Sequence, residues 1–135
     1  MVKTAIIYVS SLGGHVSKTA EIIASALDAD TFDLKKQSDI DLGGYEKLIL
    51  GVGVHAGRPY GKMTAFVAGH RDYIDTISTS LYICCMYKDD KGSAQAAKIA
   101  DMYRIHDVSF FPDSSEKDEN GQCKELRAFI ERMRK

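Results

Sequence analysis

Residues 4–27 have the sequence TAIIYVSSLGGHVSKTAEIIASAL, in which the residue pattern changes twice. The apolar, β-rich stretch over 2–9 predicts a strand, and the segment 15–28 has the apolar spacing of a helix. The positions with this spacing are Val16, Ala20, Ile23 and Leu27. Between strand and helix lies a turn that contains two serines and two glycines. Such a strand, turn and helix can place backbone amides around a phosphate group.

The rest of the chain predicts the same alternation of strands and helices. The expected strands cover 30–36, 45–54, 78–87 and 106–112, and the expected helices cover 93–103 and 123–135. Another helix is expected after Pro59, a residue that suits a first helical turn. Its apolar face consists of Met63, Phe66, Val67 and Ile74. No helix fits between the second and third strands, because the link 37–44 is short and contains Gly43 and Gly44. This order predicts a single α/β domain over residues 1–135, with a doubly wound, five-stranded parallel sheet.

Composition and charge exclude several classes of protein. The 135 residues include 18 basic and 19 acidic side chains, with a net charge of −1, so no charge excess favours nucleic acid or an anionic membrane. The apolar runs are far shorter than the roughly 20 residues that cross a bilayer, and the N-terminus lacks a signal-peptide pattern. We therefore expect a cytoplasmic protein with no nucleic-acid partner and no stable membrane insertion.

The three cysteines do not suggest a disulfide framework or a zinc site. Cys84 and Cys85 lie in a predicted buried strand and are expected to fill the core on opposite faces of the sheet. Cys123 lies near the start of the last helix, a position that favours a thiolate, and its simplest role is that of a semi-exposed thiol. We predict no metal site and no catalytic side chain.

The turn after the first strand is compatible with three kinds of phosphate site, two of which the residues exclude. A Walker A loop would require glycine where Leu12 and Ser17 stand, although Lys18 and Thr19 are correctly placed. A dinucleotide-binding fingerprint is also missing, since the turn itself contains only two glycines. The remaining hypothesis is a monophosphate held by hydroxyls and backbone amides at the start of the first helix.

The stretches IIYVSSLGGHVSKTAEIIASAL (6–27) and DLKKQSDIDLGGYEKLILGVGVHAGRP (33–59) resemble the flavodoxin-like family. The resemblance extends from about Thr4 to Tyr87. It implies a sheet order of 2-1-3-4-5 and FMN as cofactor. Within the family, the SSxxGH turn and the GxxxxxG loop are most similar to short flavodoxin-domain proteins that include the oxygen-independent protoporphyrinogen dehydrogenases.

The resemblance also implies where FMN lies. Its phosphate is expected at residues 10–16, and its ring between the loops 53–60 and 86–92. The implied cofactor-binding residues are Ser10, Ser11, Gly13, Gly14, His15, Val16, Gly53, Val54, His55, Ala56, Gly57, Tyr60, Met86 and Tyr87. Simpler roles stay open for some of them, because serines also cap helices, a first-turn histidine is often exposed, and a tyrosine often closes a strand end.

Three hypotheses for the function follow. The first is an FMN-binding electron-transfer protein whose partner is a reductase or an acceptor protein, and the second is a protoporphyrinogen dehydrogenase-like flavoenzyme. The third is a flavodoxin-fold binding module with lost or weakened FMN binding, because Gly13 and Val16 stand where the family has hydroxyls. Two missing hydrogen bonds to a charged oxygen correspond to a loss of affinity on the order of 100-fold or more.

Overall fold

The structure is a computed structural model, and it describes most of the chain. The described residues are 3–9, 15–36, 40–53, 61–85, 90–112, 119 and 122–134.

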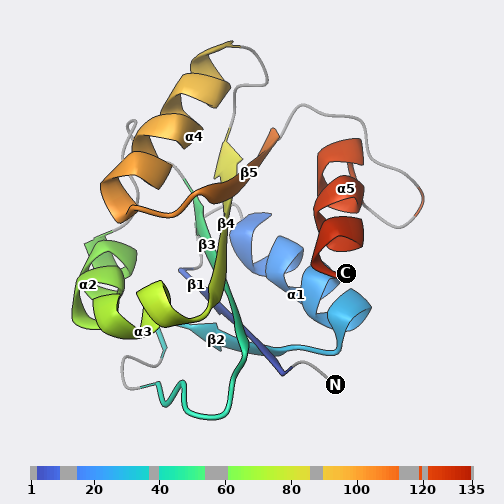
Figure 1. Ribbon diagram of the computed structural model, residues 1–135. Helices are drawn as coiled ribbons and strands as arrows, with labels where there is room; N and C mark the ends of the chain where they lie inside the picture. Colours follow the sequence, from blue (N-terminus) through green and yellow to red (C-terminus); the bar gives the residue numbers. More distant parts are fainter. Residues whose placement is uncertain are drawn as a thin grey trace.

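A parallel sheet forms the centre of the molecule (Figure 1). Its strands are β1 (Thr4–Tyr8), β2 (Asp30–Asp33), β3 (Lys47–Gly53), β4 (Ser78–Cys85) and β5 (Asp107–Pro112). They lie in the order β2-β1-β3-β4-β5, and each neighbouring pair is parallel. This confirms the predicted doubly wound, five-stranded sheet with strand order 2-1-3-4-5.

Helices cover both faces of the sheet. They are α1 (His15–Leu27), α2 (Gly61–Gly69), α3 (Arg71–Thr76), α4 (Asp90–Tyr103) and α5 (Lys124–Met133). Helices α1 and α5 lie on one face, and α2, α3 and α4 lie on the other (Figure 1). Each helix packs its apolar side on the sheet, and the predicted inward residues of α5 are all buried: Leu126, Phe129, Ile130 and Met133.

The three central strands are apolar because both of their faces are covered. In β1, Ile6 belongs to the core beneath α1 and α5, while Ala5 and Ile7 belong to the core beneath the other three helices. In β3, Ile49 lies on the α1 side and Leu50 on the opposite side. Successive side chains thus enter two separate cores, as the period of two in a strand requires.

Several predicted elements begin or end at other residues in the structure, and two of these differences change the predicted path of the chain. The segment 61–76 forms two helices, α2 and α3, rather than one, and the break falls at Gly69 and His70. The strand expected over 30–36 ends at Asp33, because the Asp33 carboxylate accepts a hydrogen bond from the Lys35 amide at 3.0 Å and turns the chain. The spacing of apolar residues indicates neither the break at His70 nor the turn after Asp33.

Within the described residues, no helix lies between β2 and β3, as predicted. This part of the chain still contributes to the core, because Ile40 and Leu42 are buried against it. Gly44 has a φ of 90°, a left-handed conformation that glycine adopts without strain.

Gly51 allows a large side chain to cross the sheet. Gly51 of β3 pairs in register with Tyr82 of β4, and the Tyr82 ring extends over the glycine on the α1 side. A Cβ atom at position 51 would lie 2.2 Å from Cζ of Tyr82, a separation that carbon atoms do not tolerate. The Tyr82 ring continues into a cluster with Phe111, stacked at 5.6 Å between ring centroids, and with Phe129 at 6.3 Å.

We expect Gly51→Ala to lower the free energy of unfolding by about 1–3 kcal/mol, because the added methyl group overlaps the Tyr82 ring. Urea denaturation measures this change. The control is Gly69→Ala at the end of α2, where an added Cβ meets no atom within 4 Å. The control should be neutral or slightly stabilising. Equal stabilities for the two variants would contradict the packing at Gly51.

Candidate functional site

The winding of the sheet reverses between β1 and β3, so the carboxyl ends of these two strands are where a ligand site is expected. These two strands are neighbours, but the chain leaves β1 through α1 on one face and leaves β3 through α2 and α3 on the other. In doubly wound sheets, ligands bind at such a point of reversal. The candidate site therefore lies beyond Tyr8 and Gly53, the last residues of β1 and β3.

Helix α1 begins at this edge. Its first residue is His15, directly after the turn 10–14 that is expected to hold a phosphate. The first amides of a helix have no partner within the helix, and the helix dipole favours an anion there. No acidic side chain lies in the first turn of α1 to oppose an anion.

The neighbouring phenol adds no negative charge to this edge. Tyr8 is half-buried at the end of β1. Burial raises the pKa of Tyr8 above its ordinary value, and the carboxylates of Asp33 and Glu21 raise it further. The phenol is therefore neutral at physiological pH.

The side chain of Val16 is part of the core. It is fully buried on the α1 side of the sheet, and its carbonyl oxygen accepts a hydrogen bond from the Tyr82 hydroxyl at 3.0 Å. Its only group left for a ligand is the backbone amide. The predicted role of Val16 in cofactor binding is therefore limited to that amide.

Gly53 is the last residue of β3, and it is buried and paired in register with Cys84. Gly53 ends β3 and Val16 lies in the first turn of α1, the strand and the helix that meet at the candidate site. The other predicted cofactor residues lie outside the described residues, apart from His15, whose backbone begins α1. They are Ser10, Ser11, Gly13, Gly14, Val54, His55, Ala56, Gly57, Tyr60, Met86 and Tyr87.

The cysteines differ in part from expectation. Cys84 is buried on the α1 side, with its Sγ 3.8 Å from Oγ1 of Thr19, which confirms a place in the core. Cys123 is not semi-exposed as predicted: only 4% of it is accessible. Burial raises the pKa of the Cys123 thiol, so its position before α5 does not favour a thiolate. The side chain of Cys85 lies outside the description.

The interaction that sequence reasoning missed is the contact of Tyr82 with Gly51 and Val16. It links β4 to the first turn of α1 across β3. One signal pointed to it, because a glycine inside an apolar strand often marks a close approach of another group. This signal indicates position 51 as a site of close approach, but it does not indicate that Tyr82 is the residue that approaches.

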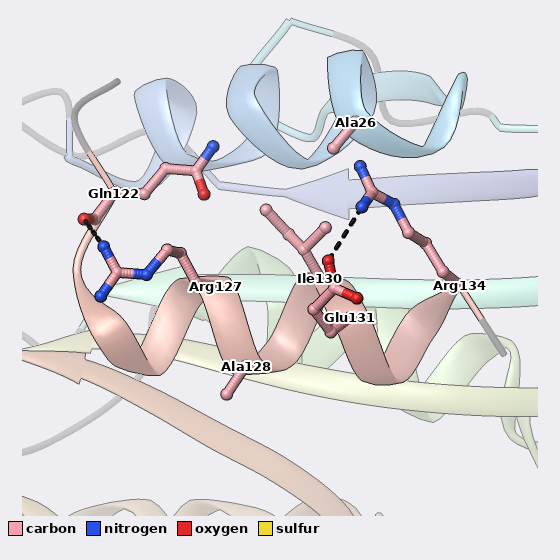
Figure 2. Close-up of a pocket in the computed structure, with 7 residues that line it drawn as sticks. All are labelled: Ala26, Gln122, Arg127, Ala128, Ile130, Glu131 and Arg134. Atoms are coloured by element: carbon pink, nitrogen blue, oxygen red, sulfur yellow. Dashed lines mark hydrogen bonds and ion pairs between the residues drawn. The ribbon is translucent and has the colours of Figure 1, made fainter. Parts of the chain in front are cut away.

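A groove of about 370 Å³ runs along α5 and is bordered by Ala26 of α1. Its lining residues are Ala26, Gln122, Arg127, Ala128, Ile130, Glu131 and Arg134. Figure 2 shows Arg127 directed toward the Gln122 carbonyl and Arg134 paired with Glu131, at 2.9 Å. The lining includes none of the predicted cofactor residues. The groove is therefore a feature of the α1–α5 flank rather than of the candidate site.

Two further findings concern the described part of the chain alone. It contains no group of three or more His, Cys, Asp or Glu side chains arranged to hold a metal ion. It also contains no helix with the length and apolar character to cross a membrane.

The strand order and the helix that begins at the point of reversal define a doubly wound α/β protein of the flavodoxin type. A family model described as a flavodoxin domain matches residues 5–118, and the chain belongs to this family. No curated protein sequence matches the chain significantly. The narrower resemblance to protoporphyrinogen dehydrogenases stays a prediction.

Solved structures share the fold at low sequence identity. The flavodoxin of Fusobacterium nucleatum bound to flavin mononucleotide is 14% identical, with a TM-score of 0.64 and 98% of each chain covered. A flavoprotein of Lactobacillus acidophilus NCFM in complex with FMN is 18% identical, with a TM-score of 0.61, 82% of this chain and 91% of that chain covered. A short-chain flavodoxin associated with a non-canonical PDU bacterial microcompartment is 12% identical, with a TM-score of 0.70, 97% of this chain and 95% of that chain covered.

We expect the Cys123 thiol to react with iodoacetamide at pH 8 at least about tenfold more slowly in the native protein than in denaturant. The raised pKa lowers the thiolate fraction, and burial blocks the reagent. Mass spectrometry of peptides reports each cysteine separately, so reaction elsewhere does not interfere. Equal rates at Cys123 in native and denatured protein would show that the thiol is accessible.

Proposed function

We propose that this protein binds FMN non-covalently at the carboxyl edge of its sheet and passes electrons between a reductase and an acceptor protein. The phosphate would be held by residues 10–16, and the ring would lie between the loops 53–60 and 86–92. The observation that carries the proposal is the position of the first turn of α1, directly beside the ends of β1 and β3. Membership of the flavodoxin domain family supports it.

The described residues fit the phosphate end of FMN. The first amides of α1, which have no partner within the helix, and the absence of an acidic side chain in its first turn favour a dianionic phosphate. Ser10, Ser11 and Gly14 are proposed to complete the loop with two hydroxyls and a close backbone approach. Since the Val16 side chain lies in the core, the loop depends on amides and serines rather than on a hydroxyl at position 16.

The electron-transfer part of the proposal rests on the chemistry of the cofactor, which accepts electrons from a donor and releases them to an acceptor. The polypeptide contributes the phosphate loop and the two loops that flank the ring. A net charge of −1 favours a dedicated partner over a general shuttle that docks through a strongly acidic surface. A cytoplasmic location is part of the same proposal.

We expect the protein freed of flavin to bind added FMN and to quench its fluorescence. Titration of FMN with the protein measures the dissociation constant. The expected affinity is weaker than a loop with all three hydroxyls would give, by a factor on the order of 100. No binding at high micromolar FMN would contradict the proposal and would favour a flavodoxin-fold binding module without a flavin.

Ser11→Ala should weaken FMN binding about tenfold or more, because a hydroxyl that donates to a phosphate oxygen is lost. The matched control is Ser25→Ala, an exposed serine near the opposite end of α1. The control should leave the dissociation constant unchanged. Equal affinities for the two variants would exclude Ser11 from the phosphate site.

The FMN-loaded protein should be reduced by a flavodoxin reductase with NADPH and should then reduce cytochrome c. A stopped-flow measurement under anaerobic conditions gives both rates, and the flavin-free protein is the control. If the loaded protein instead oxidises protoporphyrinogen and cycles poorly with the reductase, the enzyme hypothesis replaces the electron carrier.

A further inference from the structure

Tyr82 reaches from the fourth strand to the helix that begins at the candidate site. It is fully buried near the middle of β4, and its ring passes over Gly51 of the neighbouring strand. Only a glycine at position 51 leaves room for the ring, since a Cβ would lie 2.3 Å from the Tyr82 hydroxyl oxygen. The ring is held on its other sides by Phe111 and Phe129.

The hydroxyl at the end of this ring has a defined partner. It donates a hydrogen bond to the carbonyl oxygen of Val16, at 3.0 Å in a buried environment. Val16 is the second residue of α1, two residues after the turn 10–14. A carbonyl in the first turn already accepts the helical hydrogen bond from four residues later, so the tyrosine adds a second contact rather than filling a vacant one.

The phenol of Tyr82 keeps its proton at physiological pH. Burial raises the pKa of Tyr82 well above its ordinary value. The hydroxyl therefore acts as a donor at that pH, and the rigid ring spans the distance between β4 and the start of α1.

We infer that Tyr82 is a positioning residue for the cofactor phosphate, acting through the Val16 carbonyl to fix the first turn of α1. This inference rests on the proposed binding of FMN. Tyr82 touches neither the phosphate nor the ring in this account. Its effect is to hold the amides of the first turn in the orientation that an anion requires, so that binding does not have to order them.

The chain contains a matched control for this role. Tyr103 is also a buried tyrosine, and its hydroxyl shares a 3.0 Å hydrogen bond with Oγ1 of Thr64. It belongs to the core on the opposite face of the sheet and joins α4 to α2. Removing either hydroxyl costs a buried tyrosine one hydrogen bond, which is fully buried at Tyr82 and part-buried at Tyr103. Of the two tyrosines, only Tyr82 donates to α1.

The test compares Tyr82→Phe with Tyr103→Phe, using FMN and riboflavin as the two probes. Riboflavin has the same ring but no phosphate, so the ratio of the two dissociation constants isolates the phosphate end. We expect Tyr82→Phe to weaken FMN binding about two- to tenfold and to leave riboflavin binding unchanged. Tyr103→Phe should leave the ratio at its original value.

A second measurement needs no cofactor. Hydrogen exchange of the flavin-free protein should be faster at the amides of residues 17–20 in Tyr82→Phe than in the unaltered protein. The amides in α5 should keep their rates. Thermal unfolding of both variants shows that the phenylalanines, which keep the shape of the ring, preserve the fold.

The possible outcomes distinguish the inference about Tyr82 from the proposed binding of FMN on which it rests. If the unaltered protein binds FMN and Tyr82→Phe keeps the same ratio of FMN to riboflavin affinity, the inference is wrong and the proposed function stands. Faster exchange in α1 with an unchanged ratio would also overturn it, because the hydroxyl would then serve the helix alone. If the unaltered protein binds no FMN, the inference about Tyr82 and the proposed function are both wrong.

Discussion

The burial of the sheet on both faces is the constraint from which the rest of the structure follows. Strands β1, β3 and β4 are mostly apolar, and parallel neighbours can be joined only by crossovers that lie over a face. Each crossover helix returns against the direction of the strands, so its first turn comes to the carboxyl edge. Helix α1 therefore begins beside the ends of β1 and β3, and the candidate site exists because the sheet has to be covered.

Much of this architecture is predictable from local patterns. The apolar runs of the central strands and the spacing of apolar residues in α1 and α5 are strong signals. Both helices bury the side chains that the spacing selects, except that Leu27 at the end of α1 is only partly buried. The ends of the elements were predicted less accurately, because they depend on single turns of the chain. The strand after α1 ends at Asp33 because its carboxylate binds the Lys35 amide, and the segment 61–76 divides at His70. Hydrophobic spacing contains no information on the turn after Asp33 or on the break at His70.

Less of the candidate site than of the fold could be predicted from the sequence. The sequence predicts a phosphate loop before α1, but it leaves the surroundings of that loop unspecified. The burial of Cys123 depends on how closely α5 packs on the sheet, and a helix start by itself favoured a reactive thiol. The hydrogen bond from Tyr82 to Val16 depends on the register of β3 and β4, which is set by the whole sheet. Gly51, a glycine within an apolar strand, was the one local indication of this hydrogen bond in the sequence.

The contact between Gly51 and Tyr82 makes the two positions dependent on each other. No side chain can appear at position 51 while the ring occupies the space above it, and a smaller residue at position 82 would leave a void over the glycine. Either change alone damages the core, whereas a paired exchange of small and large residues would preserve its volume. In the descent of this chain, the identities at positions 51 and 82 are therefore expected to be inherited together and to change together.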